Sequence, residues 1–245
     1  AELADWVEAT YGPVWTYLSE RPATALSTSE RLLAPSLWSL LLENGNRAEN
    51  RAEIATRAKA YMGIGQEADP TALPAEDLYT AVAAGVENGD WNFYQGAIAF
   101  VRTSQNQTER VTILSAIAGE GTPEIVTDLF KLSFGDDISG NELYSIYSYA
   151  VRNEKAQSTI WPMVKDNFSN IVAKIPLIRK QQTPRIVSAF CTAEEVADAK
   201  AFFESQADLI PGYERSLAQG VEQGENCSAL RAATAEDVKA VFSND

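Results

Sequence analysis

The feature that most constrains the fold of this chain is the spacing of its apolar residues at three and four positions. Two runs that show this spacing are 111–118 and 125–134. It places side chains on one face of an α-helix, whereas a half-buried strand would alternate apolar and polar residues. The pattern predicts an all-α fold, with roughly eleven to fourteen helices and no sheet.

Signals for helix ends recur between these runs. At three places a residue that can cap a helix stands three positions before a glutamate: Ser27 with Glu30, Ser139 with Glu142, and Thr192 with Glu195. In such a capping box, each side chain bonds the backbone amide of the other residue. Pro35 lies inside the helical pattern 29–43 and predicts a kink or a break there.

The middle of the chain repeats itself at a fixed interval. Amphipathic segments at 78–85, 111–118 and 143–150 begin 33 and then 32 residues apart, and a second helical pattern follows each. A helical hairpin does not bury its apolar stripe alone, but stacked hairpins share a continuous core. We therefore predict a superhelical stack of antiparallel helix pairs, forming one domain over residues 1–245. The alternative is a non-repetitive bundle of helices of similar length.

Composition excludes several classes of function. The chain has 20 basic and 34 acidic residues, a net charge of -14, so a nucleic-acid partner is not expected. No apolar run approaches the roughly 18 to 20 residues of a membrane span. With no histidine and two cysteines, the chain has no closed Cys/His zinc site and no Ser-His or Cys-His catalytic pair.

The last third of the chain carries an ordered set of motifs. They are Trp161 with Asn167-Phe168 and Ile171, Phe190-Cys191-Thr192 with Glu194-Glu195, Phe202-Phe203, and Glu214-Arg215-Ser216-Leu217-Ala218-Gln219. This order resembles the end of the large zinc aminopeptidases of the aminopeptidase N, puromycin-sensitive and endoplasmic-reticulum aminopeptidase group. Asp5-Trp6-Val7 with Tyr11 is similar to the entry into the same C-terminal domain.

The resemblance implies a superhelical bowl of HEAT- or armadillo-like helix pairs, an α-solenoid that covers the active site of a catalytic domain and encloses the peptide substrate. The zinc motif His-Glu-x-x-His and the Gly-x-Met-Glu-Asn motif of that group are absent here. The resemblance therefore implies a non-catalytic C-terminal part of a longer aminopeptidase. Its partners would be the peptide and the catalytic zinc-peptidase domain of the same polypeptide, which would hold the zinc, so no cofactor is expected in this chain.

Three polar residues are candidates for contact with a peptide. Arg215 is expected in the first turns of a helix, where its guanidinium would take a peptide carboxylate through two parallel hydrogen bonds. An ion pair with a nearby glutamate is the alternative, and Arg185 has the same two interpretations. Gln219 stands one turn beyond Arg215 on the same face, either orienting that arginine or remaining solvated.

Tyr147 is the aromatic candidate. Tyr144 and Tyr147 share one helical face, while Tyr149 points elsewhere. The face with Tyr147 would line the concave surface of a stacked repeat. Packing in the core or between repeats is the alternative, and aromatic residues at helical spacing more often have that role.

Cys191 and Cys227 form a possible disulfide. Cys191 precedes the turn at Ile210-Pro211-Gly212 and Cys227 follows it, so two antiparallel helices flanking that turn would bring both sulfurs to one end. The bridge would stabilise the fold by roughly 3 to 4 kcal/mol on the chain-entropy model. A bridged protein would be periplasmic or secreted, and a pair of buried free thiols would instead indicate the cytoplasm.

Two other functions compete with a peptidase accessory domain. A free-standing helical-repeat scaffold would bind a protein or peptide partner on its concave face. An independent enzyme that uses two carboxylates is the third hypothesis, but no suitably spaced pair of acids stands out in the sequence.

Overall fold

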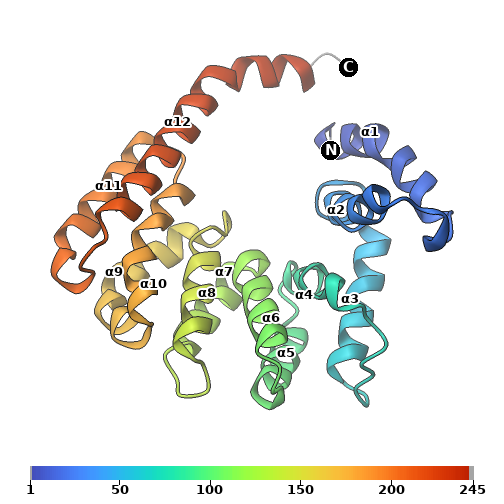
Figure 1. Cartoon of the computed structure of the whole chain (residues 1–245), viewed down its shortest axis with the longest axis horizontal. Helices are drawn as coiled ribbons and strands as arrows, with labels where there is room; N and C mark the ends of the chain where they lie inside the picture. The colour runs from blue at the N-terminus through green and yellow to red at the C-terminus, as the bar shows by residue number, and fades with distance from the viewer. Residues whose placement is uncertain (1, 243–245) are drawn as a thin grey trace. The chain divides into compact units, whose positions relative to one another are not determined.

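The computed structural model describes residues 2–242, and every regular element in that range is helical (Figure 1). The prediction of an all-α fold is confirmed. The α-helices are α1 (Glu2–Ser19), α2 (Thr28–Asn44), α3 (Ala48–Met62), α4 (Leu78–Val86), α5 (Trp91–Thr103), α6 (Gln107–Glu120), α7 (Pro123–Leu132), α8 (Gly140–Ala150), α9 (Gln157–Lys174), α10 (Leu177–Gln182), α11 (Ala193–Ser205) and α12 (Glu214–Phe242). Four short 3₁₀ segments join them: η1 (Ala23–Ala25), η2 (Ala75–Asp77), η3 (Thr183–Ala189) and η4 (Ala207–Leu209).

The three predicted capping sites begin helices. Complete capping boxes form at Ser27 with Glu30 before α2 and at Ser139 with Glu142 before α8. Before α11, the Thr192 hydroxyl accepts from the Glu195 amide and donates to its carboxylate, so only half of the box is present. These bonds satisfy amide groups that the first turn of a helix leaves without a partner.

Helix α2 is not broken at Pro35. It runs from Thr28 to Asn44 with the proline inside, although proline lacks the amide that would close its own turn. The capping box fixes the start of this helix. In its second half, the side chains of Leu37, Leu41 and Leu42 are buried in the core. Packing and capping therefore keep the helix continuous. Of the predicted kink or break, the break is wrong, and the kink stays a prediction.

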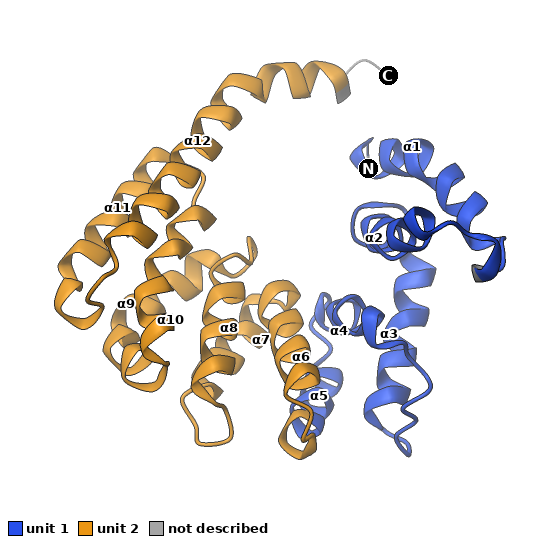
Figure 2. Ribbon diagram, in the orientation of Figure 1, with its two compact units in different colours: residues 1–100 blue, residues 101–245 orange. Residues whose placement is uncertain are grey.

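The chain divides into two compact units, residues 1–100 and residues 101–245 (Figure 2). In the first unit, α1 packs on α2 and α3 packs on α4. One core cluster of this unit joins Val7 and Leu18 to Leu37 and Leu41, and the indoles of Trp15 and Trp38 stack at 4.7 Å. The prediction of a single domain over 1–245 stays a prediction, and residues 1 and 243–245 lie outside the described range.

Helix pairs in the second unit pack on the pair that follows. Helix α6 packs on α8, and α7 packs on α9, while α6 with α7 and α8 with α9 are neighbours in sequence. The segments predicted to repeat at 78–85, 111–118 and 143–150 fall in α4, α6 and α8. The residues at 113–118 of α6 are all buried, which accounts for the apolar character of that segment.

A buried ion pair joins α6 to α8. Arg110 Nε donates to Glu142 Oε1 at 2.6 Å, and Arg110 Nη2 donates to the Asp137 carbonyl at 2.8 Å. The Glu142 side chain is 1% exposed and also accepts from the Ser139 amide at 2.6 Å. Burial acts to raise the pKa of Glu142, but the bonds from Arg110 and Ser139 outweigh it and lower that pKa.

A buried asparagine makes a second polar link between successive pairs. Asn153, in the turn between α8 and α9, donates its side-chain amide to the carbonyls of Ala118 and Gly121 at 3.1 and 2.9 Å. Its Oδ1 accepts from the amides of Lys155 and Ala156. One side chain thus holds both the end of α6 and the start of α9, and these bonds satisfy a polar group in the core.

We expect Glu142→Gln to lower the free energy of unfolding by about 2–4 kcal/mol at neutral pH. The change keeps the side-chain volume but leaves the largely buried Arg110 guanidinium without its counter-charge. Urea unfolding measures this loss. Asp137→Asn is the matched control, because it breaks the exposed Arg102–Asp137 pair and should cost less than about 1 kcal/mol.

The pH dependence of the unfolding free energy gives a second test with the Glu142→Gln variant. The pKa of Glu142 is lower in the folded protein than in the unfolded chain. Its ion pair therefore stabilises the fold at pH values above the unfolded-state pKa, and this stabilisation is lost as the pH falls through the folded-state pKa. The difference between wild type and Glu142→Gln should therefore shrink in acid. Equal losses for the two variants at neutral pH would contradict the role assigned to the buried pair.

Candidate functional site

An aromatic cluster lies between α9 and α11 in the second unit. Trp161, on α9, contacts the rings of Phe190, Phe202 and Phe203 with centroids 5.1, 5.4 and 6.0 Å away. Phe168, two turns along α9, contacts the same pair of phenylalanines on α11. The spacing of Ile160, Val164, Phe168 and Ile171 turns one face of α9 into the core, and Trp161 lies at the edge of that face, 7% exposed.

Asp198 of α11 holds the polar edge of this tryptophan. The indole Nε1–H donates to Asp198 Oδ2 at 2.8 Å. Lys165, one turn after Trp161, places its ammonium 3.1 Å from the same oxygen and 5.6 Å from the indole centroid. The hydrogen bond from Trp161 lowers the pKa of Asp198 most strongly, burial opposes it, and Lys165 lowers the pKa further, so the carboxylate stays ionised at neutral pH.

A pocket of about 530 Å³ opens at this cluster, and we call it the α9–α11 pocket. Its apolar wall is formed by Trp161, Pro162 and Phe190. Its polar groups include four carboxylates and one ammonium, from Glu154, Glu194, Glu195, Asp198 and Lys165, with Gln157 and Ser158 beside them. An apolar wall with a few converging polar groups is typical of small-ligand sites of this size.

A second hollow of about 420 Å³ lies between α11 and α12. Leu217, Ala218 and Val221 form its apolar part, and Lys200, Glu204, Tyr213, Glu214, Glu222 and Glu225 contribute its polar groups. It too has four carboxylates against one ammonium. The carboxylates in both pockets favour cationic ligands over anionic ones.

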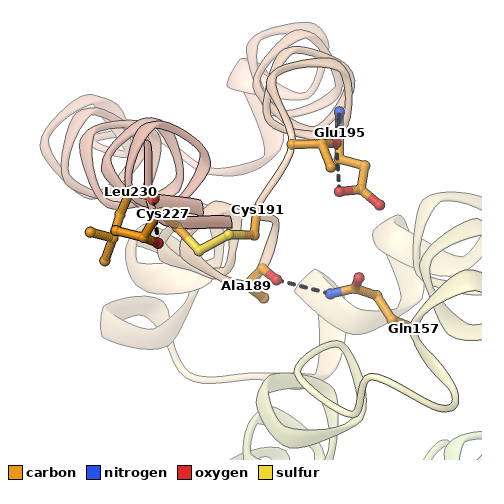
Figure 3. Close-up of a disulfide and its surroundings, with 8 residues drawn as sticks. Gln157, Ala189, Cys191, Glu195, Cys227 and Leu230 are labelled. Atoms are coloured by element: carbon orange, nitrogen blue, oxygen red, sulfur yellow. Dashed lines mark hydrogen bonds between the residues drawn. A yellow bond between two sulfur atoms is a disulfide. The ribbon is translucent and has the colours of Figure 1, made fainter. Parts of the chain in front are cut away.

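The Cys191–Cys227 bridge fastens α12 beside the first of these pockets. The two sulfurs are bonded, with Cα atoms 5.1 Å apart (Figure 3). In the same view, the Gln157 side-chain amide donates to the Ala189 carbonyl, two residues before Cys191, at 3.1 Å. The bridge therefore joins α12 to the segment that provides Phe190 to the α9–α11 pocket.

Two glycines allow α12 to lie close to η3. A Cβ on Gly220 would stand 2.8 Å from the Pro184 carbonyl oxygen, and one on Gly224 would stand 3.1 Å from the oxygens of Val187 and Phe190. Gly220 and Gly224 are one turn apart, so they form a smooth stripe against η3. Gly212 closes the preceding turn with φ of 83°, a value that favours glycine.

Tyr147 does not reach a binding surface. It is 1% exposed, and its hydroxyl donates to the Thr183 carbonyl at 2.8 Å, joining α8 to η3. Burial raises the pKa of this hydroxyl, so it stays protonated as a donor. Its burial contradicts the prediction that Tyr147 contacts a peptide directly, and the packing alternative describes its position.

The two candidate arginines are exposed and the candidate glutamine is half-buried. Arg185 lies on η3, and Arg215 and Gln219 lie one turn apart near the start of α12. Neither arginine forms an ion pair within the described residues. The ion pair between Arg215 and a nearby glutamate, which was the alternative interpretation, is therefore not present there. The structure brings η3 and α12 together at Gly220, next to Gln219, but neither arginine lines the two pockets above.

Sequence reasoning did not predict this pocket. Trp161, Phe190, Glu194 and Glu195 were named only as parts of family motifs or of a capping site, and Lys165 and Asp198 were not named at all. The available signal was an aromatic residue and a lysine one turn apart on α9, a spacing that lets a cation approach a ring. The sequence did not indicate that Asp198, 37 residues away, would complete the group.

Comparison with known proteins assigns this chain to a family. The model of a family described as "ERAP1-like C-terminal domain" matches residues 1–226. The chain belongs to this family. The suspected relation to the C-terminal domain of the aminopeptidase group is thus confirmed. A search of curated proteins finds no match.

Membership of the ERAP1-like family gives context to two further observations. None of the described helices is both long and apolar enough to cross a membrane. Within the described residues, no three cysteine or acidic side chains are grouped so that they could hold a metal ion.

The bridge leads to a prediction that a mass measurement can check. Without reductant, the unfolded chain should take up no alkylating agent, and after reduction it should take up two equivalents. Because the bridge closes a loop with a sequence separation of 36, replacing both cysteines by serine should lower the free energy of unfolding by about 3–4 kcal/mol. Two alkylated thiols in the unreduced protein would disprove the bridge.

Proposed function

We propose that this chain is the non-catalytic C-terminal domain of a zinc-dependent aminopeptidase, covering the active site and enclosing the peptide substrate. The observation that carries the proposal is the family match over residues 1–226 in a chain that contains no histidine. A zinc aminopeptidase site uses imidazole ligands, so the metal and the acid/base chemistry would belong to the catalytic domain of the same polypeptide.

The arrangement within the second unit supports an enclosing role. Helix pairs that pack on the next pair, α6 on α8 and α7 on α9, are the local pattern from which a HEAT-like α-solenoid is built. We propose that this pattern continues along the chain as a superhelical stack with a concave face. The Cys191–Cys227 bridge supports an oxidising compartment, such as a periplasm, for the whole enzyme.

Arg185, Arg215 and Gln219 are the proposed peptide-binding residues of this domain. Both arginines are exposed and free of ion pairs in the described part of the chain, so each guanidinium is available to a carboxylate. An arginine can take a carboxylate with two parallel hydrogen bonds, which fixes its orientation as well as its position. Gln219 is one turn from Arg215, and this spacing supports the proposal that it bonds the same group.

The division of labour can be tested with two purified proteins. Alone and with added zinc, the chain should release no product from an aminoacyl p-nitroanilide. When added to the catalytic half of its parent polypeptide, it should bind that half and change the cleavage of long peptides more than that of the small chromogenic substrate. Turnover by the chain itself, or failure to bind the catalytic half, would overturn the proposal.

Binding of a peptide carboxylate by Arg215 can be tested with a fluorescent peptide. Arg215→Gln should weaken the binding of a fluorescent peptide with a free C-terminal carboxylate by about five- to tenfold, since charge-assisted hydrogen bonds are lost. The amidated form of the same peptide should bind wild type and variant alike. Arg231→Gln, an exposed arginine further along α12, is the matched control and should change neither affinity.

A further inference from the structure

We propose that the α9–α11 pocket binds the guanidinium side chain of an arginine in a peptide. The inference deepens the proposed function, because the peptide is the ligand class that function supplies, and it assigns a preference for one side chain. It rests on three features of the pocket: its aromatic wall, its unpaired carboxylates, and the internal cation that it already accommodates.

The aromatic wall suits a flat cation. The indole of Trp161 contacts the rings of Phe190, Phe202 and Phe203, donates a hydrogen bond to Asp198, and borders the pocket with the 7% of its surface that stays exposed. A tryptophan face attracts cations, and a guanidinium can also stack on it as a planar group. Pro162 is exposed beside the buried Phe190, and it extends the apolar wall with a surface for the methylene groups of the same side chain.

The carboxylates provide the opposite charge. Within the described residues, the side-chain carboxylates of Glu154 and Glu194 form no hydrogen bond or ion pair, so both can accept from a ligand. Glu195 is engaged with the Thr192 hydroxyl, and Asp198 with Trp161 and Lys165. With four acids against one lysine, the pocket has a charge of -3, which complements a peptide cation and disfavours an acidic one.

Lys165 shows that this wall can hold a cation. Its ammonium lies 5.6 Å from the Trp161 ring centroid and 3.1 Å from an Asp198 oxygen, the two kinds of contact that a peptide arginine would make. The lysine is part of the chain, so it competes with such a ligand for Asp198. Its removal should therefore strengthen binding, whereas removal of a carboxylate should weaken it.

The proposed site has a volume that fits the ligand. At about 530 Å³, the pocket falls within the range of small-ligand sites and is larger than one arginine side chain needs, which leaves room for adjoining backbone. The segment that carries Phe190 is fixed by the Gln157 bond to Ala189 and by the Cys191–Cys227 bridge. A wall fixed in this way loses little conformational freedom when it binds.

A blocked peptide makes the test specific to this pocket. The probe is acetyl-Ala-Ala-Arg-Ala-Ala-amide, and the comparison peptide has glutamine in place of arginine. Neither has a charged terminus, so capture of a carboxylate by Arg215 does not contribute. The reporter is the indole N–H resonance of Trp161 in the nitrogen-15-labelled chain, assigned by its loss in Trp161→Phe and followed during titration at low salt.

We expect the arginine peptide to shift this resonance and to bind at least tenfold more tightly than the glutamine peptide. Glu154→Gln and Glu194→Gln should each weaken its binding about three- to fivefold, the range of partly exposed ion pairs. Lys165→Gln should strengthen binding by a similar factor. Asp166→Asn, which removes an exposed carboxylate of α9 outside the pocket, is the matched control and should leave the affinity unchanged.

Three results would overturn the assignment. They are equal binding of the two peptides, an unmoved Trp161 resonance at saturation, and weaker binding by Lys165→Gln in a chain whose spectrum is otherwise native. None of them bears on association with a catalytic half, so the proposed function would stand even if this pocket proved not to bind arginine. Failure of that association, with arginine binding intact, would leave the pocket as a peptide-binding site of different purpose.

Discussion

The buried pairing of Arg110 with Glu142 is the interaction on which the arrangement of the second unit depends. An ionised carboxylate in a core is costly unless charge and hydrogen bonds compensate it, and Glu142 receives both from Arg110 and Ser139. The same carboxylate completes the capping box of α8 and fixes its distance from α6. One side chain therefore begins a helix and sets the packing of one pair on the next.

Many elements of this fold could be predicted from sequence, because local signals mark the start of several helices and the apolar face of others. Ser139 and Glu142 are three residues apart, and their capping box needs no knowledge of the rest of the chain. The helices at 78–85, 111–118 and 143–150 were predicted in the same way, from the apolar spacing within each segment. The break that was one of the two outcomes predicted at Pro35 does not occur, because the packing of Leu37, Leu41 and Leu42 outweighs a local helix-breaking signal.

The candidate site was harder to predict, because its residues meet through packing. Helical spacing shows that Tyr147 shares a face with Tyr144, but not which neighbour covers that face. The covering segment is η3, where the Thr183 carbonyl accepts a hydrogen bond from the Tyr147 hydroxyl. Asp198 pairs with Trp161 and Lys165 across 37 and 33 residues. No short-range pattern encodes such a separation, which is set by where α11 lies against α9.

The disulfide depends both on a local sequence feature and on a contact between distant segments. Gly220 and Gly224 have no side chain to hold α12 away from η3, so the helix approaches until Cys227 meets Cys191. Once bonded, the cysteines limit how far the segment before α11 can move, and this segment supplies Phe190 to the pocket wall. A small-residue stripe at one end of α12 thus helps to fix an aromatic surface on α9, which is why the pocket's geometry depends on residues that do not line it.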